Sequence, residues 1–259
     1  MPVPRPVSVK VTSVVVSVFV AAGCAGNVSL NGEGPSSSHS SKSSSKRKEG
    51  KGKEGTARKE LAGLKDATPA SMNGYSRDEF GTAWKDVDHN GCDTRNDILV
   101  RDLTDVKKRN KCVVISGDLD DPYTGRTVIF AKAHATEVQI DHVFPLGLAW
   151  KMGAARWTED KRTQLANDRD NLLAVSGRPN EQKGDKGPSE WQPPKAFQCI
   201  YAEKFIAVAD EYHLSVTHAD HTELGDMLDT PPRPVFDADI AKLLMRTLAR
   251  GRHEVLRLE

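Results

Sequence analysis

The chain has 259 residues and a nearly balanced charge, with 37 basic residues, 36 acidic residues and a formal net charge of +1. This balance excludes a storage or architectural DNA-binding protein, because no overall basic field would attract a polyanion. Binding of nucleic acid would therefore depend on a local patch. The length allows one or two domains, but residues 1–70 lack the apolar content of a core, so we expect one domain of ordinary size.

The N-terminus has the features of an export signal. Arg5 and Lys10 precede an apolar run, Val11 to Ala22, that is too short for a membrane span. The run ends in Ala-Ala-Gly-Cys, which resembles a bacterial lipobox. Residues 1–23 are therefore predicted to be a lipoprotein-type signal peptide, with Cys24 as a lipid anchor to the membrane. The alternative is an ordinary secreted protein that is cleaved near Cys24.

Residues 24–70 are predicted to form a disordered Gly/Ser/Lys linker. The segment has eight serines between Ser36 and Ser45 and almost no apolar residues, so burial cannot offset the entropy of ordering it. Lys42 to Glu60 carries eight basic and three acidic residues. This run could contact anionic lipid, cell-wall polymer or nucleic acid, or it could be a solvated spacer.

Residue periodicity predicts the elements that follow. Short β-branched runs at residues 113–117 and 127–130 flank a turn-rich connection and indicate an antiparallel pair, and a third extended run covers residues 136–140. Helices are expected where apolar residues recur at helical spacing: 77–87, 95–103, 146–152, 158–166, 197–212 and, in the tail, 237–248.

An acidic loop lies between the first two predicted helices. Asp86, Asp88 and Asn90 occupy positions one, three and five of an EF-hand-like calcium loop, and Asp97 occupies position twelve. Asp97 is shorter than the bidentate Glu that is usual there. A plain Asp/Asn/Gly turn is therefore favoured over a calcium site.

Three cysteines would remain if Cys24 were lipidated, and export would permit a disulfide between two of them. Three pairings are then open. Cys92 with Cys112 is the favoured pair, because both cysteines lie at ends of neighbouring elements, and Cys199 would then be free or buried. No C-x-x-C spacing is present, so a thioredoxin-like motif and a zinc ribbon are excluded.

Two features of the second half of the chain receive structural interpretations. Trp191 is expected in the core rather than as a platform for stacking bases. His213, His218 and His221 form a loose cluster, but their spacing fits no strong zinc-ligand pattern. We interpret them as surface histidines.

The chemistry is expected where the third extended run ends, at Asp141 and His142. Hydrolysis of a phosphodiester needs a nucleophilic water, a cation that offsets the charge on phosphorus, and a proton for the leaving oxygen. An acid and an imidazole side by side can hold a metal ion and activate a water. Because neighbouring side chains of a strand point to opposite sides, the strand is expected to bend here.

The stretch Ile-Asp-His-Val-Phe-Pro-Leu at 140–146 is followed by Asn-Leu-Leu-Ala-Val at 171–175 and Asn-Glu-Gln-Lys-Gly-Asp at 180–185. Together they resemble the HNH nuclease motif, in the secreted actinobacterial branch of the DUF1524, or GmrSD C-terminal, type. The resemblance covers roughly Tyr75 to Asp220. It implies an α+β fold with a small ββα-metal core of the His-Me finger kind embedded in helices.

The resemblance also implies residue roles. Asp141 would be a metal ligand, His142 the general base, and Asn171 the residue that orients the loop carrying the base. Asn180 stands where many HNH nucleases have a His, and its oxygen suits Mg²⁺ or Mn²⁺ better than Zn²⁺. Lys183 would stabilise phosphate charge.

Arg95 belongs to a segment, residues 92–99, that is similar to a signature of the same family. In that interpretation it binds a substrate phosphate. The alternative is an arginine that braces its helix through a carboxylate.

We therefore predict an exported, metal-dependent HNH endonuclease that hydrolyses DNA, rather than RNA, with little sequence preference. The nuclease domain is expected at 71–220, followed by an extension at 221–259, in a monomer. The alternative from another class is a non-catalytic surface lipoprotein that serves as a binding module and could hold calcium in the Asp86 loop. A third is a phosphohydrolase of small nucleotides, which would cleave a chromogenic phosphodiester but not a plasmid.

Overall fold

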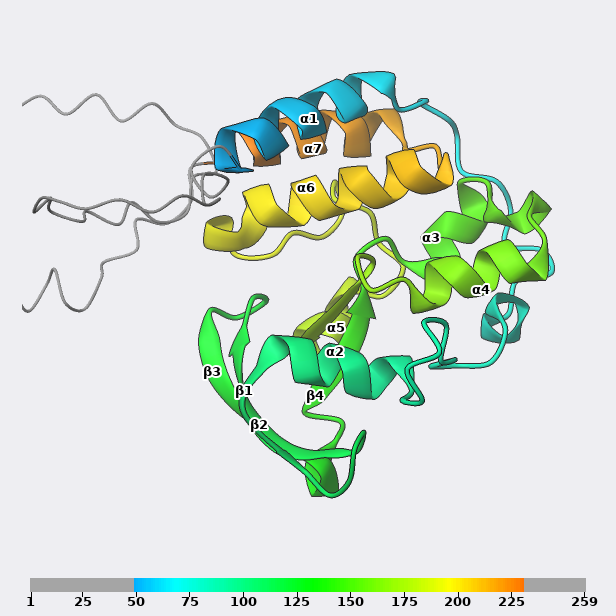
Figure 1. Cartoon of the computed structure of the whole chain (residues 1–259). Helices are drawn as coiled ribbons and strands as arrows, with labels where there is room; N and C mark the ends of the chain where they lie inside the picture. Colours follow the sequence, from blue (N-terminus) through cyan, green and yellow to red (C-terminus); the bar gives the residue numbers. More distant parts are fainter. Residues whose placement is uncertain (1–48, 231–259) are drawn as a thin grey trace, which may run out of the picture.

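The computed structural model describes residues 49–230 (Figure 1). The predicted signal peptide, the Cys24 anchor, the first half of the predicted linker and the predicted helix at 237–248 lie outside these residues. No helix within 49–230 combines the length and the apolar character that a membrane crossing needs.

The described strands form two antiparallel sheets. The first has the order β1-β2-β3, and the second pairs β4 with β5. Their bounds are Leu103–Lys108 (β1), Val114–Asp121 (β2), Arg126–Ala131 (β3), Val138–His142 (β4) and Leu172–Ser176 (β5). The predicted pair is confirmed as β2 and β3, whereas β1 was missed because its Leu-Thr-Asp-Val-Lys-Lys sequence carries little apolar signal.

Helices make up most of the remaining structure, and the α+β class is confirmed. The α-helices are α1 (Glu49–Gly63), α2 (Thr94–Asp102), α3 (Leu146–Lys151), α4 (Glu159–Asn167), α5 (Gly177–Lys183), α6 (Lys195–Tyr212) and α7 (His218–Leu228). Short 3-10 helices are η1 (Arg77–Phe80), η2 (Lys132–His134) and η3 (Ala154–Arg156). The side chains of Asp93, Thr158 and Thr217 cap α2, α4 and α7, which explains where these helices begin.

The helix predicted over residues 77–87 is wrong beyond its first turn. Only η1 forms, and it ends at Gly81, which has a φ of +75°. The chain then takes the left-handed conformation again at Trp84, with a φ of +58°. Phe80 is buried in the core as the spacing suggested, but the Trp84 ring is stacked instead near His142.

The linker predicted over residues 24–70 is wrong for its second half, because α1 packs on α6 and α7 to form a helical layer (Figure 1). Ala57 and Leu61 of α1 are 3% and 7% exposed. Their spacing of four was hidden among charged residues and glycines. The predicted boundary at residue 220 also differs from the structure, since it falls inside α7, whose Leu224, Met227 and Leu228 are buried.

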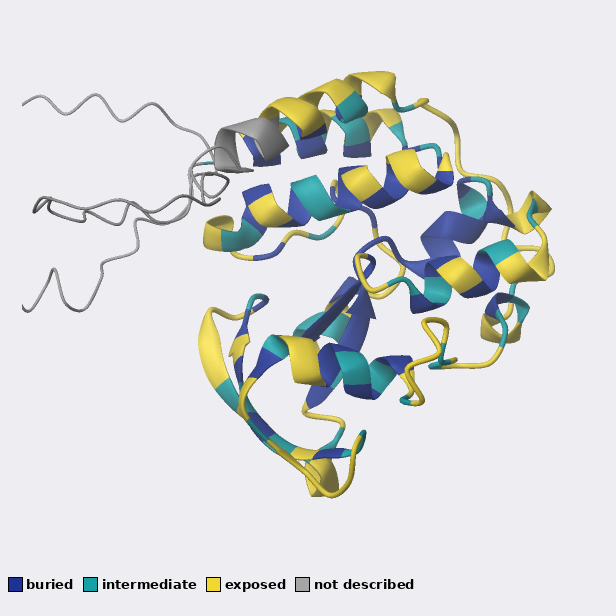
Figure 2. Ribbon diagram, in the orientation of Figure 1, coloured by how far each residue is buried: buried dark blue, intermediate teal, exposed yellow. Residues whose placement is uncertain are grey.

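The β4–β5 ribbon lies between two hydrophobic cores. Leu173 and Val175 of β5 join the larger core, which α3, α6 and α7 complete. Leu172 and Ala174, on the alternate positions, join the smaller core with α2 and the three-stranded sheet. The ribbon is buried along nearly its whole length in Figure 2, and this places the Asp141–His142 pair at its end between two rigid layers.

Candidate active site

Asp141 and His142 are the last two residues of β4. They remain in regular register with Leu173 and Leu172 of β5, so the expected bend of the strand is not present. Both nevertheless line one cleft of about 420 Å³. The cleft is bounded by η1, β4 and α5, with lining residues Tyr75, Arg77, Gln139, Ile140, Asp141, His142, Pro145, Leu146, Asn180, Glu181, Gly184 and Asp185.

The Asp141 carboxylate is only 5% exposed and has two strong partners. Lys183 donates from Nζ to Oδ1 at 3.0 Å, and the Tyr123 hydroxyl donates to Oδ2 at 2.6 Å. Burial raises the pKa of Asp141 and lowers that of Lys183, while the charge of each partner opposes the shift of the other. Burial also holds the pKa of Tyr123 well above its usual range, so the phenol stays a donor.

His142 is 8% exposed, and its Nε2 lies 2.9 Å from the carbonyl oxygen of Ala166. A carbonyl can only accept, so a neutral imidazole must carry its proton on Nε2 and leave Nδ1 unprotonated. Burial is the main cause that lowers the pKa of His142 to about 4, and the nearby charges of Arg77 and Lys183 act in the same direction. At neutral pH the ring is therefore neutral and able to accept a proton at Nδ1.

Asn171 fixes the chain directly after His142. Its Oδ1 accepts from the Phe144 amide at 2.8 Å, and its Nδ2 donates to the carbonyl oxygens of Phe144 and Leu165. Its own carbonyl accepts from the Val143 amide at 2.7 Å. Asn171 is fully buried, and these contacts are the ones that an orienting residue would make.

The two predicted residues of α5 lie at different depths. Asn180 lines the cleft and donates from Nδ2 to Gln139 Oε1 at 2.7 Å, which leaves its Oδ1 without a hydrogen bond from the described residues. Lys183 is 0% exposed and also donates to the carbonyl oxygen of His142 at 2.7 Å. Lys183 therefore lies beneath the cleft, where it holds Asp141 instead of facing a phosphate.

Arg95 is not part of the cleft. It donates to the carbonyl oxygens of Ala135 and Val138, at 3.2 and 3.0 Å, and so braces the start of β4. The sequence suggested either a phosphate or a carboxylate as its partner. The structure gives it backbone carbonyls, in a separate hollow beside β2 and β3.

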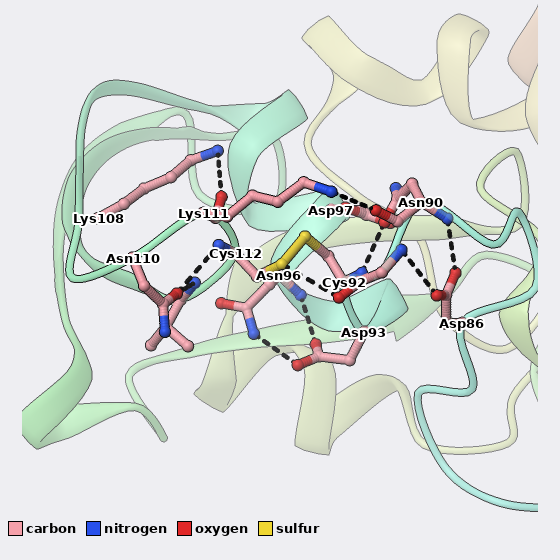
Figure 3. The surroundings of a disulfide bond; sticks show 12 residues. Asp86, Asn90, Cys92, Asp93, Asn96, Asp97, Lys108, Asn110, Lys111 and Cys112 are labelled. Carbon is pink, nitrogen blue, oxygen red and sulfur yellow. Dashed lines mark hydrogen bonds between the residues drawn. A yellow bond between two sulfur atoms is a disulfide. The ribbon is translucent and has the colours of Figure 1, made fainter.

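The predicted calcium loop is closed by its own backbone (Figure 3). Asp86 accepts from the amides of Asn90 and Gly91, and Asn90 Nδ2 donates to Asp88 and Asp97. Burial alone would raise the pKa of Asp86, but these N–H donors outweigh it and lower the pKa. The loop has the hydrogen bonding of an Asp/Asn/Gly turn.

A disulfide between Cys92 and Cys112 anchors this loop to the start of β2 (Figure 3). Lys111 adds a hydrogen bond from Nζ to the Asn90 carbonyl oxygen at 2.7 Å. Cys199 is 4% exposed and is also disulfide-bonded, so it is buried but not free. Within residues 49–230 no cysteine is a free thiol.

His218 and His221 both contact Asp66, at 2.8 and 2.6 Å, and neither lines the cleft. His213 instead ends α6 with a φ of +56°. Among the described residues no group of three His, Cys, Asp or Glu side chains could hold a metal ion. Trp191 packs on Tyr123, with ring centroids 4.7 Å apart, and joins the larger core as expected.

Three side chains around Asp141 and His142 were not found by sequence reasoning. Tyr123 comes from the β2–β3 turn, Trp84 from the bend after η1, and Arg77 from the start of η1. The Trp84 and His142 rings are stacked, with centroids 6.3 Å apart. The one signal at Trp84 is its left-handed backbone conformation, which is uncommon for a residue other than glycine. No pattern in the sequence predicts that conformation.

The donor atoms that face the cleft suit a hard divalent cation. Mg²⁺ is usually held by one or two carboxylates together with substrate phosphate and several waters, so a cluster of three acids is not required. Asp141 keeps acceptor capacity, because each of its oxygens has two lone-pair sites and uses one. Asn180 Oδ1 is a second oxygen donor on the same cleft.

Comparison with known proteins adds the family. The model of the GmrSD restriction endonucleases, C-terminal domain, matches residues 93–227. An "Uncharacterized secreted protein" of Arthroderma benhamiae (strain ATCC MYA-4681 / CBS 112371) is 42% identical over 178 residues, which cover 68% of this chain and 84% of the relative. No solved structure matches this chain. The actinobacterial origin of the resemblance stays a prediction. The family description indicates a nuclease, and the matched range is more than half of the chain. The chain therefore belongs to the family of GmrSD restriction endonuclease C-terminal domains.

Proposed function

We propose that this protein is an exported, metal-dependent endonuclease of the HNH type that hydrolyses DNA with little sequence preference. The observation that supports this most is the state of His142. It is a buried neutral imidazole that donates from Nε2 to a carbonyl and leaves Nδ1 free to accept a proton at a cleft. In this proposal β4, β5 and α5 would be the two strands and the helix of the ββα unit.

His142 would act as the general base. Its Nδ1 removes a proton from a water, whose oxygen attacks phosphorus while the bond to the leaving alkoxide breaks and that alkoxide takes a proton from solvent. A divalent ion held by Asp141 and Asn180 would supply positive charge to the phosphate oxygens. Asn171 keeps the imidazole in place through the backbone of residues 143–144.

We propose a role for Lys183 that differs from the one the sequence suggested. Its ammonium, at 3.0 Å from Asp141, neutralises a buried carboxylate and fixes its direction. A carboxylate that is held on both oxygens keeps one geometry before substrate arrives. Such preorganisation is favourable for catalysis because no reorganisation is needed during the reaction.

Export is supported by the relative, which is called secreted, and by the disulfide between Cys92 and Cys112, because disulfides persist in oxidising compartments. We propose free secretion rather than anchoring through a lipidated Cys24, because Cys92, Cys112 and Cys199 are all disulfide-bonded and the sequence holds only one other cysteine. A monomeric state is also part of the proposal. DNA is chosen as substrate because the family is one of restriction endonucleases.

The test is nicking of supercoiled plasmid by the full-length protein with Mg²⁺, Mn²⁺, Ca²⁺ or Zn²⁺, or with EDTA. The protein must include α1, since its Ala57 and Leu61 belong to the core. We expect cleavage with Mg²⁺ or Mn²⁺, and a loss of about 10²- to 10⁴-fold in His142→Ala, the range for a general base. His134→Ala, an exposed histidine of η2, is the matched control and should cleave normally.

Two results would contradict the proposal. Absence of cleavage with every ion, by a protein shown to be folded, would favour the binding-module interpretation. Cleavage of a chromogenic phosphodiester without cleavage of plasmid, single-stranded DNA or RNA would indicate a phosphohydrolase of small molecules.

A further inference from the structure

The cleft needs a cation that can reach a phosphate, and both cations predicted from the sequence are engaged elsewhere. Lys183 is fully buried against Asp141, and Arg95 donates to the carbonyl oxygens of Ala135 and Val138, at the start of β4. Arg77 is different. It is exposed, and no ion pair or hydrogen bond joins its guanidinium to another residue in the part of the chain that the structure describes.

Arg77 also has a distinctive position. A second hollow, of about 90 Å³, shares lining residues with the cleft of about 420 Å³ and is lined by η1, the bend at Trp84 and the end of α4. Three residues line both hollows: Arg77, His142 and Leu146. A chain-like substrate that occupies both hollows would therefore pass next to both Arg77 and His142.

We propose that Arg77 binds the phosphodiester that is cleaved at His142, as the substrate-binding cation of this site. The inference rests on the proposed function and names the residue that binds the phosphate of the substrate. A guanidinium presents paired N–H donors that match two phosphate oxygens, so it neutralises charge and orients the group at once. η1 starts at Arg77 and is fixed by the buried Phe80, which gives the arginine a rigid base.

The acidic groups near Arg77 do not remove its charge. Asp78 follows it in η1, and Glu181 and Asp185 line the larger hollow, yet none forms an ion pair with Arg77 among the residues described. Glu181 instead accepts from Gln139, and Asp185 accepts from the Gly147 amide. The positive charge of Arg77 also helps to keep His142 neutral, which agrees with its closeness to the base.

The competing interpretation is that Arg77 affects only the imidazole and never contacts substrate. The two interpretations differ in the salt dependence of binding. Each phosphate contact contributes a slope of about −0.9 to the plot of log K against log salt for duplex DNA, and removal of one contact reduces the slope by that amount. An arginine that only tunes His142 would leave the slope unchanged.

The experiment has two measurements. The first is binding of a fluorescent DNA duplex to the full-length His142→Ala protein, with and without Arg77→Gln, over a series of salt concentrations. The second is plasmid cleavage by the wild type, Arg77→Gln, Arg77→Lys and Arg156→Gln. Arg156 is the matched control, because it is an exposed arginine in η3 that lines neither hollow.

We expect Arg77→Gln to weaken binding and to lower kcat/KM about 10- to 100-fold, the size of a hydrogen bond to a charged group. The salt slope should fall by about one unit. Arg77→Lys should recover part of the loss, because it keeps the charge without the paired geometry. Arg156→Gln should match the wild type.

The proposal is overturned if Arg77→Gln equals Arg156→Gln in both measurements while the wild type cleaves, and the proposed function then stands. If the wild type binds DNA but does not cleave it, the proposed function fails, while the slope still tests Arg77. If the wild type neither binds nor cleaves DNA, both proposals fail.

Discussion

Two acidic clusters in this protein, around Asp141 and in the Asp86 loop, could each be interpreted from sequence as an ion site, and they differ in structure. Around Asp141 the partners are a lysine and a tyrosine from distant elements, all of them buried, next to a neutral histidine. In the Asp86 loop the partners are amides and side chains within the same short segment, and most of them are exposed. The first cluster therefore depends on the tertiary fold, whereas the hydrogen bonds of the second come from its own segment.

The difference teaches how to separate a catalytic arrangement from a turn that resembles one. A turn satisfies its acids with neighbouring N–H groups, which lower the pKa of Asp86 without any help from the rest of the fold. A buried acid such as Asp141 needs a charged partner, because an unpaired charge in the interior is very unfavourable. Substitutions should therefore have large effects in the first cluster and small effects in the second.

The largest effect on stability is expected from Lys183→Met. It leaves Asp141 as an unpaired buried charge, which costs about 3–5 kcal/mol in the free energy of unfolding. Urea denaturation would measure it. Lys186→Met is the control, since Lys186 is exposed and contacts only the Gln182 carbonyl in the same region. Equal stability of the two variants would show that Asp141 does not depend on Lys183.

The next effect concerns the support of the Asp86 loop. The disulfide joins cysteines 20 residues apart. Removal of a disulfide that closes a loop of this size lowers the free energy of unfolding by about 3 kcal/mol. The double variant Cys92→Ser/Cys112→Ser should be destabilised by that amount in urea. Substitution is preferable to a reducing agent, because a reducing agent would also act on Cys199. An unchanged unfolding midpoint would mean that the internal hydrogen bonds alone hold the loop.

Tyr123→Phe tests the second partner of Asp141. It removes a 2.6 Å hydrogen bond and leaves one buried carboxylate oxygen unsatisfied, a loss of about 1–3 kcal/mol. The control is Tyr75→Phe, because the Tyr75 hydroxyl makes no hydrogen bond among the described residues. If Asp141 must be held on both sides, Tyr123→Phe should also require more Mg²⁺ for half-maximal cleavage. A stability equal to that of Tyr75→Phe, together with an ion requirement equal to that of the wild type, would contradict this.

These comparisons also explain what the sequence could predict. The sequence could propose Asp141, His142, Asn171 and Asn180 as site residues because they lie in short recognisable motifs. Helices α2, α4 and α6 and the β2–β3 pair follow from periodicity. Tyr123, Arg77 and the buried position of Lys183 depend on how distant elements dock, and no spacing encodes that. The helix α1 was missed for a similar reason. Its few apolar residues stabilise a helix only because they pack against α6 and α7.

The smallest effect is expected from Asp86→Asn, which tests whether the loop is a turn or a calcium site. Because the pKa of Asp86 is lowered by folding, its carboxylate stabilises the protein above the ordinary pKa of 3.8, and this contribution is lost as the pH falls through the folded-state value. The wild type should therefore be slightly more stable than Asp86→Asn at pH 7, and the difference should disappear in acid. Asp226→Asn, at an exposed acid in α7, is the control for removal of a surface carboxylate.

Calcium gives the decisive arm of the same experiment. A site that binds calcium only in the folded state raises stability by about 2.7 kcal/mol at a hundredfold excess over Kd, and Asp86→Asn would remove that gain. A loop whose acids are already bonded to Asn90 and Gly91 should show no shift of Tm with Ca²⁺. A Tm shift that Asp86→Asn abolishes would instead show that the loop binds calcium. The two acidic clusters would then differ in the ion that each binds, and burial would no longer separate a functional cluster from a turn.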